Sequence, residues 1–129
     1  MKILISPAKS INEHCEFPSF DYTQPTFSKE AKALAGKLKK MKAKDIMELM
    51  HVSKDIAELN VNRNKSWYLS AEPTEEVRPA AFLFTGEVYK GLDVESLSAK
   101  ELEKAQQNLR ILSGMYGLLK PMDLIYPYR

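Results

Sequence analysis

The sequence predicts a mixed α/β fold of the α+β kind, rich in helix and built around a small sheet. Two short apolar runs, residues 2–6 and 80–84, have the length and composition of buried strands. They alternate with longer segments whose apolar residues follow helical spacing. Because two isolated strands are only marginally stable in water, either the helices form most of the core or part of the sheet is missing.

The composition is that of a soluble protein with one domain. The chain has 129 residues, of which 44% are hydrophobic and 28% are charged, and its net charge of +2 is too small to indicate nucleic-acid binding by itself. No apolar run approaches the length of a membrane span. The single cysteine, Cys15, excludes an internal disulfide and is typical of a reducing compartment. We therefore expect a cytoplasmic protein with no membrane partner.

The N-terminal segment begins with an apolar run and then becomes irregular. Residues 2–6 (KILIS) predict a buried strand, and Pro7 ends it because proline fixes its own φ and disfavours helix at Ser6. Residues 10–27 contain two prolines and few periodic positions. A segment of this length without regular structure is expected to pack on the body of the protein or to carry function.

Three helices are predicted between residues 28 and 68. Ser28 is placed to cap the first, the second covers Ala43 to Met50, and Ser53 caps a third that extends to about Tyr68. The first helix has a predicted buried face at helical spacing, formed by Ala31, Leu34, Ala35, Leu38 and Met41.

The opposite face of the first helix is basic. Seven lysines and a single acid, Glu30, occur between Lys29 and Lys44. The outward face carries Lys32, Lys37, Lys39 and Lys40. Such a run is either a solvated helix surface or a surface that meets an anionic partner, and the sequence leaves both interpretations open.

The second half of the chain adds a linker, a strand and a helix. Residues 72–79 form an acidic linker that contains proline, and the apolar run at 80–84 (AAFLF) follows it as the second predicted strand. Ser98 and Glu101 have the Ser-x-x-Glu spacing of a capping box, which predicts a helix from there to about Leu109.

The turn ISPAKS, residues 5–10, follows the first strand, and such a turn is a common position for a functional group. Ser6 and Lys9 have the Ser-x-x-Lys spacing of a nucleophile pair. That pair acts from the start of a helix, where the spacing stacks the two side chains. Since Pro7 and the preceding strand disfavour this geometry, the pattern favours a binding or turn role over nucleophilic catalysis by Ser6.

Residues of metal-ligand type occur together at His14, Cys15 and Glu16, yet adjacent residues do not easily converge on one ion. His51 is the only other histidine, and no Cys/His spacing indicates zinc. We predict neither a metal site nor a cofactor.

The stretch LSGMYGLLKP, residues 112–121, places Gly114 and Gly117 between two cations, Arg110 and Lys120. Glycine permits positive φ or the close approach of another group to the backbone. A glycine hairpin with exposed amides and flanking cations suits a phosphate contact that ignores base identity. A plain turn explains the glycines equally well, and the spacing leaves the question open.

Three blocks of the sequence together resemble the YaaA family of bacterial peroxide-stress proteins. They are ISPAK near the start, F-x-G-x-V-Y-x-G-L at Phe84 to Leu92, and LRILSGMYGLLKPMDLIYPYR at Leu109 to Arg129. Family members are roughly twice this length. The resemblance therefore implies that residues 1–129 are the N-terminal portion of a single YaaA-like domain whose C-terminal half is absent. The missing half would cover apolar surface on residues 1–129. Without that half, the exposed apolar surface would favour self-association.

The resemblance implies cytosolic protection against hydrogen peroxide by limiting free iron and the DNA damage that it causes. It also implies a mixed α/β fold, a positively charged cleft, and DNA binding through a helix–hairpin–helix element. On this sequence, Leu112 to Gly117 is the best match to the hairpin, although Gly-x-x-Gly differs from the usual Gly-x-Gly.

Our first hypothesis is a non-enzymatic stress protein that binds DNA without sequence preference. The expected DNA-binding residues are Lys9, Arg110, Gly114, Gly117, Lys120 and Arg129. The cations would pair with phosphates, and the two glycines would admit the phosphate backbone.

Two alternatives remain. The first is an enzyme of unknown reaction on a nucleotide or nucleobase-like substrate, with Ser6, Lys9 and Tyr116 near one pocket. The second is an iron-handling protein, which is disfavoured because two histidines without clustered carboxylates make a poor iron site.

Overall fold

A three-stranded sheet forms the centre of one part of the molecule. The computed structural model describes residues 2–8 and 10–128. Strand β1 (Ile3–Ile5) pairs in parallel with β3 (Leu109–Ser113), and β3 pairs antiparallel with β4 (Gly117–Leu119), which gives the order β1-β3-β4. The predicted first strand is therefore confirmed, and it pairs with the segment that leads to the two glycines. Its predicted burial is wrong, because Ile3 and Leu4 are 48% and 59% exposed on a strand at the edge of the sheet.

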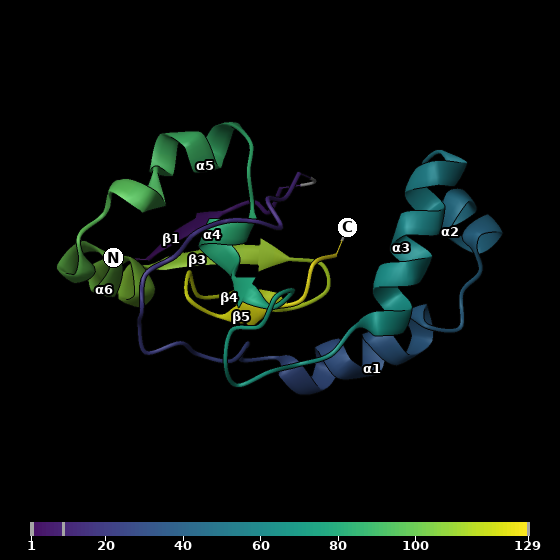
Figure 1. Cartoon of the computed structure of the whole chain (residues 1–129), viewed down its shortest axis with the longest axis horizontal. Coiled ribbons are helices and arrows are strands. Elements are labelled where there is room, and N and C mark those ends of the chain that lie inside the picture. Colours follow the sequence, from purple (N-terminus) through teal and green to yellow (C-terminus); the bar gives the residue numbers. More distant parts are fainter. Residues whose placement is uncertain (1, 9, 129) are drawn as a thin grey trace.

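Helices make up most of the rest of the described chain. They are α1 (Ser28–Leu38), α2 (Ala43–Met50), α3 (Lys54–Ser66), α4 (Ala80–Leu83), α5 (Glu87–Leu92), the 3-10 helix η1 (Val94–Ser96) and α6 (Ala99–Asn108). Helices α1, α2 and α3 stand together at one end of the molecule, α6 lies at the other end, and α5 lies above the sheet in this view (Figure 1). The predicted mixed α/β fold, rich in helix with a small sheet, is confirmed.

Local capping signals set several helix boundaries where the sequence predicted them. Helix α2 has the predicted bounds, and the Ser53 hydroxyl accepts a hydrogen bond from the Ile56 amide at 3.4 Å. Ser98 and Glu101 form the predicted capping box, with bonds of 2.9 and 3.2 Å. Ser28 instead begins α1 as its first helical residue.

The predicted strand at residues 80–84 is wrong, because Ala80–Leu83 forms the one-turn helix α4. The segment has no β-branched residue, and alanine and leucine are among the strongest helix formers. Pro79 precedes the turn in extended conformation, and Arg78–Pro79 (β2) pairs antiparallel with Leu124–Ile125 (β5). The predicted burial is nevertheless confirmed, since all four residues of α4 are buried.

Trp67 connects the helical part of the molecule to the sheet part. It follows α3 directly, and its indole Nε1 donates a hydrogen bond of 2.8 Å to the hydroxyl of Tyr116, next to β4. The two rings lie 6.2 Å apart between centroids. Both side chains are buried, at 6% and 0% exposure, so this contact lies inside the core that the two parts share.

The irregular segment 10–27 packs on the body of the protein, as expected. Ile11 forms an isolated bridge with Phe84, and Thr23 forms one with Asp123. Asp123 is fully buried; the Thr23 hydroxyl and the Lys120 amide both donate hydrogen bonds to its carboxylate. Burial raises the pKa of Asp123, an effect that these bonds and the charges of Lys120 and Arg110 oppose.

One face of the three-stranded sheet is left largely uncovered. Leu112 pairs with Leu118 across the hairpin, and both leucines point to the side opposite the core, at 51% and 40% exposure. Leu4 of β1 is 59% exposed and lies on the same face, because it pairs with Arg110, two residues before Leu112. These residues are part of the apolar exposure that the sequence predicted.

In the part of the chain that the structure describes, none of the helices combines the length and the apolar character that a membrane span requires.

Candidate functional site

Three of the sequence motifs meet at the carboxyl edge of the sheet. Because β1 and β3 are parallel, the turn after β1 and the turn after β3 lie at the same edge. The third motif is F-x-G-x-V-Y-x-G-L at Phe84 to Leu92. The hydroxyl of its Tyr89 donates a hydrogen bond of 2.7 Å to the carbonyl of Ser6. A Cβ added to Gly86 would lie 3.9 Å from the Cβ of Ala8, so that motif also packs against the turn. The carboxyl edge of parallel strands is the usual position of ligand sites in sheets of this kind.

A cavity of about 500 Å³ opens beside this edge, facing α1–α3. Its walls on the helix side are Leu34, Leu38, Leu49, Met50 and Asn64. Its walls on the sheet side are Pro7, Ala8, Gly114, Met115 and Tyr128. Figure 1 shows the α2–α3 pair set apart from the sheet. We refer to this space as the edge cavity; its volume is within the range of small-molecule sites.

Tyr128 closes one side of the edge cavity and is fixed by its neighbours. Its hydroxyl shares a hydrogen bond with the hydroxyl of Ser113, and burial raises its pKa. Its ring packs edge-on against Tyr116 at 5.4 Å and against Phe84 at 6.1 Å. The aromatic contacts therefore form a rigid wall behind the glycine turn.

Ser6 and Tyr116, two of the residues expected near one pocket if the protein were an enzyme, lie in different environments. Ser6 is exposed, and Tyr116 is fully buried. The Tyr116 hydroxyl accepts hydrogen bonds from Trp67 Nε1 and the Tyr126 amide and donates one to the Tyr126 carbonyl, which uses all its hydrogen-bonding capacity. Burial also raises its pKa. Tyr116 thus has a structural role in the described chain, and Lys9 lies outside the described residues.

The expected DNA-binding residues are also divided. Since Ile111 pairs with Leu119, Arg110 and Lys120 follow next to each other at the open end of the hairpin. Gly114 lies at the turn, four residues of strand or roughly 13 Å from Arg110. The Arg110 guanidinium donates bonds of 2.8 Å to two backbone carbonyls at the end of α6. Two further expected residues, Lys9 and Arg129, are outside the part of the chain that the structure describes.

The two glycines have different surroundings. Gly114 is exposed, and a Cβ added there would meet nothing within 4 Å. Gly117 has a φ of +72°, and a Cβ there would lie 2.8 Å from Cδ2 of Phe27. The Phe27 ring therefore occupies the space next to Gly117. Of the two glycines, only Gly114 leaves its backbone open to another group.

The helix–hairpin–helix assignment at Leu112 to Gly117 is wrong for these residues. Leu109–Ser113 and Gly117–Leu119 are strands, so the hairpin joins two strands and not two helices. The capping-box helix ends at Asn108, and the apolar alternation that follows has a buried side and an exposed side, which is the pattern of a strand.

A second hollow lies along the lysine face of α1. This groove, of about 470 Å³, is lined by Lys32, Ala35, Gly36, Lys39, Trp67, Tyr68 and Leu69. Lys32 and Lys39 are seven residues apart, or two helical turns, so they stand on one side of the helix with Gly36 between them. The sequence predicted the lysines but not the aromatic residues beside them, because Trp67 and Tyr68 reach α1 from the end of α3.

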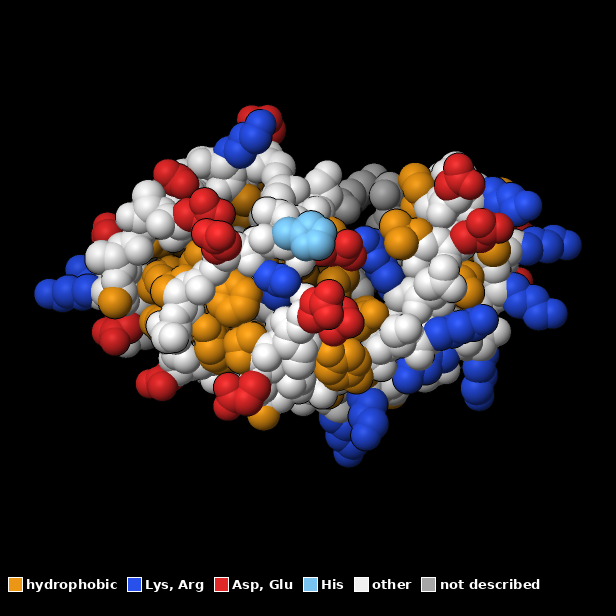
Figure 2. All heavy atoms as spheres, viewed as in Figure 1, with side chains coloured by type: hydrophobic (Ala, Val, Ile, Leu, Met, Phe, Trp, Pro, Cys, Tyr) orange, Lys and Arg blue, Asp and Glu red, His pale blue; other side chains and the backbone are white. Residues whose placement is uncertain are grey.

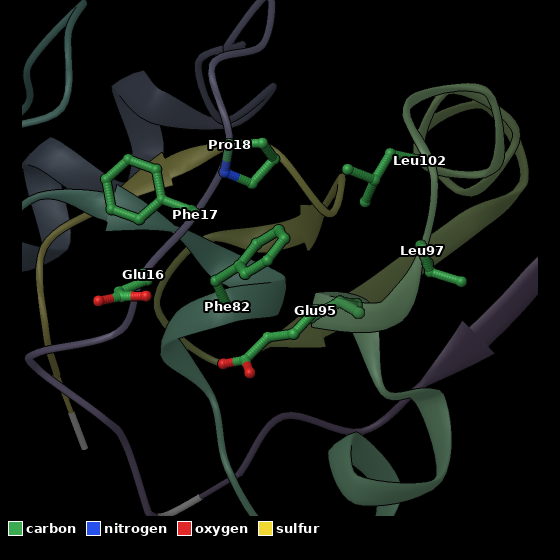
Figure 3. Close-up of a pocket in the computed structure, with 8 residues that line it drawn as sticks. Glu16, Phe17, Pro18, Phe82, Glu95, Leu97 and Leu102 are labelled. Atoms are coloured by element: carbon green, nitrogen blue, oxygen red, sulfur yellow. The ribbon is translucent and has the colours of Figure 1, made fainter.

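A third hollow is acidic and lies at the other end of the molecule. Its volume is about 430 Å³, and the rings of Phe17 and Phe82 form part of its lining. Figure 3 shows Glu16 and Glu95 on one side of the Phe82 ring and the two leucines of the lining on the other. Nothing in the sequence indicated this hollow, because its residues come from the irregular segment, α4, η1 and α6.

The charges are unevenly distributed over the chain. Residues 28–66 contain ten Lys and Arg and five Asp and Glu, whereas the rest contains nine and twelve. Figure 2 shows most of the Lys and Arg side chains projecting from the α1–α3 side, and most of the Asp and Glu side chains elsewhere on this face. The groove on α1 is therefore the hollow with the most positive surroundings.

Cys15 has the environment of an unreactive thiol. It is 3% exposed, and burial raises its pKa even though the Arg78 guanidinium lies 4.0 Å from its sulfur. Arg78 is 63 residues away from Cys15 in the chain, so the sequence alone does not indicate this neighbour. Among the described residues, no three His, Cys, Asp or Glu side chains are grouped as metal ligands.

Comparison with known proteins identifies the family. The family model described as peroxide stress protein YaaA matches residues 1–129. A UPF0246 protein of Flavobacterium johnsoniae is 48% identical over 129 residues, which are 100% of this chain and 51% of that protein. UPF0246 proteins of Aliivibrio fischeri and Neisseria gonorrhoeae are 46% and 43% identical over the whole chain and 49% of their own length. The chain spans about half the length of these relatives, and it belongs to the peroxide stress protein YaaA family.

Proposed function

We propose that this chain serves in protection against peroxide as a non-enzymatic protein that binds the phosphate backbone of DNA without reading its sequence. In this proposal it acts in the cytoplasm and limits the damage that free iron and peroxide cause in DNA. The family to which the chain belongs supports the link to peroxide stress. The lysine-lined groove on α1 is the observation that carries the DNA contact.

The groove has the chemistry of a backbone contact. Lys32 and Lys39 are both exposed, and they lie about 10 Å apart along the helix axis. Gly36 stands between them, and a Cβ there would meet nothing within 4 Å, so a phosphate can approach the helix closely. Tyr68 lines the groove and is 36% exposed, so its ring offers apolar surface to a sugar or an unpaired base, whereas Trp67 is buried at the base of the groove.

The distribution of charge gives the bound DNA an orientation. The groove belongs to the basic segment 28–66, whereas Glu16 and Glu95 lie at the acidic hollow at the other end of the molecule. A polyanion is attracted to the first region and repelled by the second. Arg110 and Lys120 add a second cationic pair on the exposed face of the sheet, where they contribute less because Arg110 is already bonded to two carbonyls.

Paired lysine substitutions test this proposal. Lys32→Ala with Lys39→Ala is compared with Lys100→Ala and Lys104→Ala, two exposed lysines on α6 that give the same change of net charge. Fluorescence anisotropy with several labelled duplexes gives the affinity at a series of salt concentrations. Because each phosphate contact contributes roughly 0.9 to the slope of log K against log salt, the α1 pair should make the slope shallower by about 1.8 on every sequence.

The control pair on α6 should leave the slope and the affinity close to those of the unchanged chain. Lys120→Ala serves as a third variant, with a smaller expected effect than the α1 pair. If the α1 pair binds DNA like the unchanged chain while Lys120→Ala weakens binding, the phosphate contact lies on the hairpin and the proposal for α1 is wrong.

A further inference from the structure

Trp67 and Tyr116 bring into direct contact an indole and a phenol, two groups that lose an electron readily. Trp67 is the only tryptophan of the chain. Its Nε1 donates the 2.8 Å hydrogen bond to the Tyr116 hydroxyl, and the two rings are tilted by 34° at a centroid distance of 6.2 Å. Contact at hydrogen-bond distance is what the transfer of a hydrogen atom between the two groups requires.

The pair connects a charged surface to the core. Trp67 lies at the base of the groove on α1, whereas Tyr116 is fully buried and packs against the ring of Tyr128 at 5.4 Å. An oxidant that enters the groove therefore meets the indole and is separated from the phenol. Because the exposed side chains of Lys32 and Lys39 line the same groove, their field favours an oxidant that carries negative charge.

The hydrogen bonds of the Tyr116 hydroxyl suit a phenoxyl radical. Its oxygen accepts bonds from Trp67 Nε1 and, at 3.1 Å, from the Tyr126 amide. A phenoxyl oxygen has no proton to donate, and these two donors continue to solvate it inside the core. Only the bond that the hydroxyl donates to the Tyr126 carbonyl is lost. Burial raises the pKa of Tyr116, so the phenol is protonated at neutral pH and has a hydrogen atom to give.

We propose that Trp67 and Tyr116 form a radical relay, which takes the oxidising equivalent of an anionic one-electron oxidant from the groove and moves it into the core. The carbonate radical anion, which forms where peroxide, ferrous iron and hydrogencarbonate meet, belongs to this class of oxidant. In the first step it takes one electron and the Nε1 proton from Trp67. The products are hydrogencarbonate and the neutral indolyl radical of Trp67.

In the second step a hydrogen atom passes from Tyr116 to Trp67. The hydroxyl turns its proton from the Tyr126 carbonyl to Nε1, its O–H bond breaks, and the N–H bond of the indole forms again. The direction follows from bond strength, since the O–H bond of a phenol is weaker than the N–H bond of an indole. The restored Nε1–H then donates to the phenoxyl oxygen, which is the same hydrogen bond as in the resting protein. The relay clears the radical from the groove whether or not DNA is bound there.

Time-resolved absorption tests the relay, because indolyl and tyrosyl radicals absorb at different wavelengths. A laser flash produces the carbonate radical from persulfate and hydrogencarbonate. A Tyr68→Phe background removes the half-exposed phenol beside the groove, which the oxidant would otherwise attack directly. The indolyl signal should appear first and convert into the tyrosyl signal at a rate that is independent of protein concentration and slower in D2O. A rate that rises with protein concentration, or is the same in D2O, would overturn the inference.

Tyr116→Phe in this background should abolish the conversion and leave a longer-lived indolyl radical. Tyr128→Phe is the matched control, because its hydroxyl bonds to Ser113 and not to the indole, and the conversion should continue at the unchanged rate. Conversion in Tyr116→Phe as in the background chain, or its loss in Tyr128→Phe, would show that the radical takes another route. Circular dichroism checks that each variant is folded, and the concentration and D2O measurements decide the question if Tyr116→Phe is not.

The α1 lysines test where the oxidant enters. Lys32→Ala with Lys39→Ala should slow the formation of the indolyl radical, by less at high salt, and leave its conversion unchanged. The pair Lys100→Ala and Lys104→Ala on α6 should change neither step. If the α1 pair forms the indolyl radical as fast as the control pair, the proposed entry through the groove is wrong.

The two proposals fail in different ways. If DNA binds on α1 but no tyrosyl radical follows the indolyl radical, the relay is overturned and the DNA contact stands. If the radical passes from Trp67 to Tyr116 and DNA does not bind, the relay stands and the proposed function falls.

Discussion

The helical part of this molecule, residues 28–66, and the sheet part differ both in charge and in what determines their structure. The helical part is basic, and capping residues and helical periodicity set most of its boundaries. The sheet part is acidic, and contacts between residues far apart in the sequence hold it together. Trp67, bonded to Tyr116, connects the two.

The comparison also separates two uses of glycine. At Gly36 on α1, an added Cβ would meet nothing within 4 Å, so the helix surface between Lys32 and Lys39 is open, as the proposed DNA contact requires. Gly117 in the sheet part has positive φ and packs under Phe27, so glycine is needed there for the fold. A glycine pattern alone therefore does not distinguish a binding turn from a structural one.

Gly117→Val should give the largest effect on stability. Valine at a φ of +72° is strained, and its Cβ would lie 2.8 Å from the Phe27 ring, so we expect a loss of roughly 3 kcal/mol of unfolding free energy. Thermal or urea unfolding measures it. Gly114→Ala is the control, with an expected change within about 0.5 kcal/mol because nothing lies near its Cβ. Equal losses for the two variants would show that Phe27 does not constrain Gly117.

Short-range patterns explain what the sequence predicted correctly. Ser53 and the Ser98–Glu101 pair mark helix starts by contacts within three residues, and the bounds of α2 follow from its periodicity. A strand at residues 2–6 was also expected, since an apolar run that ends at a proline is a strong local signal, but its predicted burial is wrong because Ile3 and Leu4 are 48% and 59% exposed.

Long-range contacts explain what the sequence could not predict. Residues 80–84 were predicted to form a strand because the run is short and apolar. Ala80–Leu83 instead forms a helical turn, in line with the helix propensity of alanine and leucine, and the preceding residues Arg78–Pro79 (β2) pair with β5. The contact of Gly117 with Phe27 spans 90 residues of sequence, and the groove on α1 exists only because Trp67 and Tyr68 pack beside it. The burial of Tyr116 likewise follows from packing between elements.

Tyr116→Phe should weaken the connection between the two parts by a smaller amount. The change leaves the Trp67 indole and the Tyr126 amide without their acceptor inside the core, at a cost of about 2 kcal/mol. Chemical denaturation checks this value. Tyr68→Phe, at an exposed hydroxyl, should change stability by less than about 0.5 kcal/mol. If the Tyr116→Phe chain is as stable as the unchanged chain, the hydrogen bonds of the Tyr116 hydroxyl do not contribute to the stability of the protein.

Asp123→Asn should have the smallest effect, and one that depends on pH. Burial raises the folded-state pKa of Asp123 above its ordinary value of 3.8, so the folded chain holds this proton more tightly than the unfolded chain. The stability from this group is fully present below the unfolded-state pKa and is lost as the pH rises through the folded-state pKa. Asparagine has no such titration. Melting temperatures measured from pH 3.5 to 7 should therefore rise for the variant relative to the unchanged chain, and a constant difference would contradict the raised pKa.

The most direct test of the central claim is lysine footprinting of the chain with and without DNA. Exposed lysines are acetylated with a limiting reagent, and mass spectrometry gives the modified fraction at each position. The account predicts that bound DNA protects Lys32 and Lys39 on α1 and leaves Lys100 and Lys104 on α6 as reactive as before. Equal protection of the two pairs, or protection of Lys120 without the α1 lysines, would contradict it.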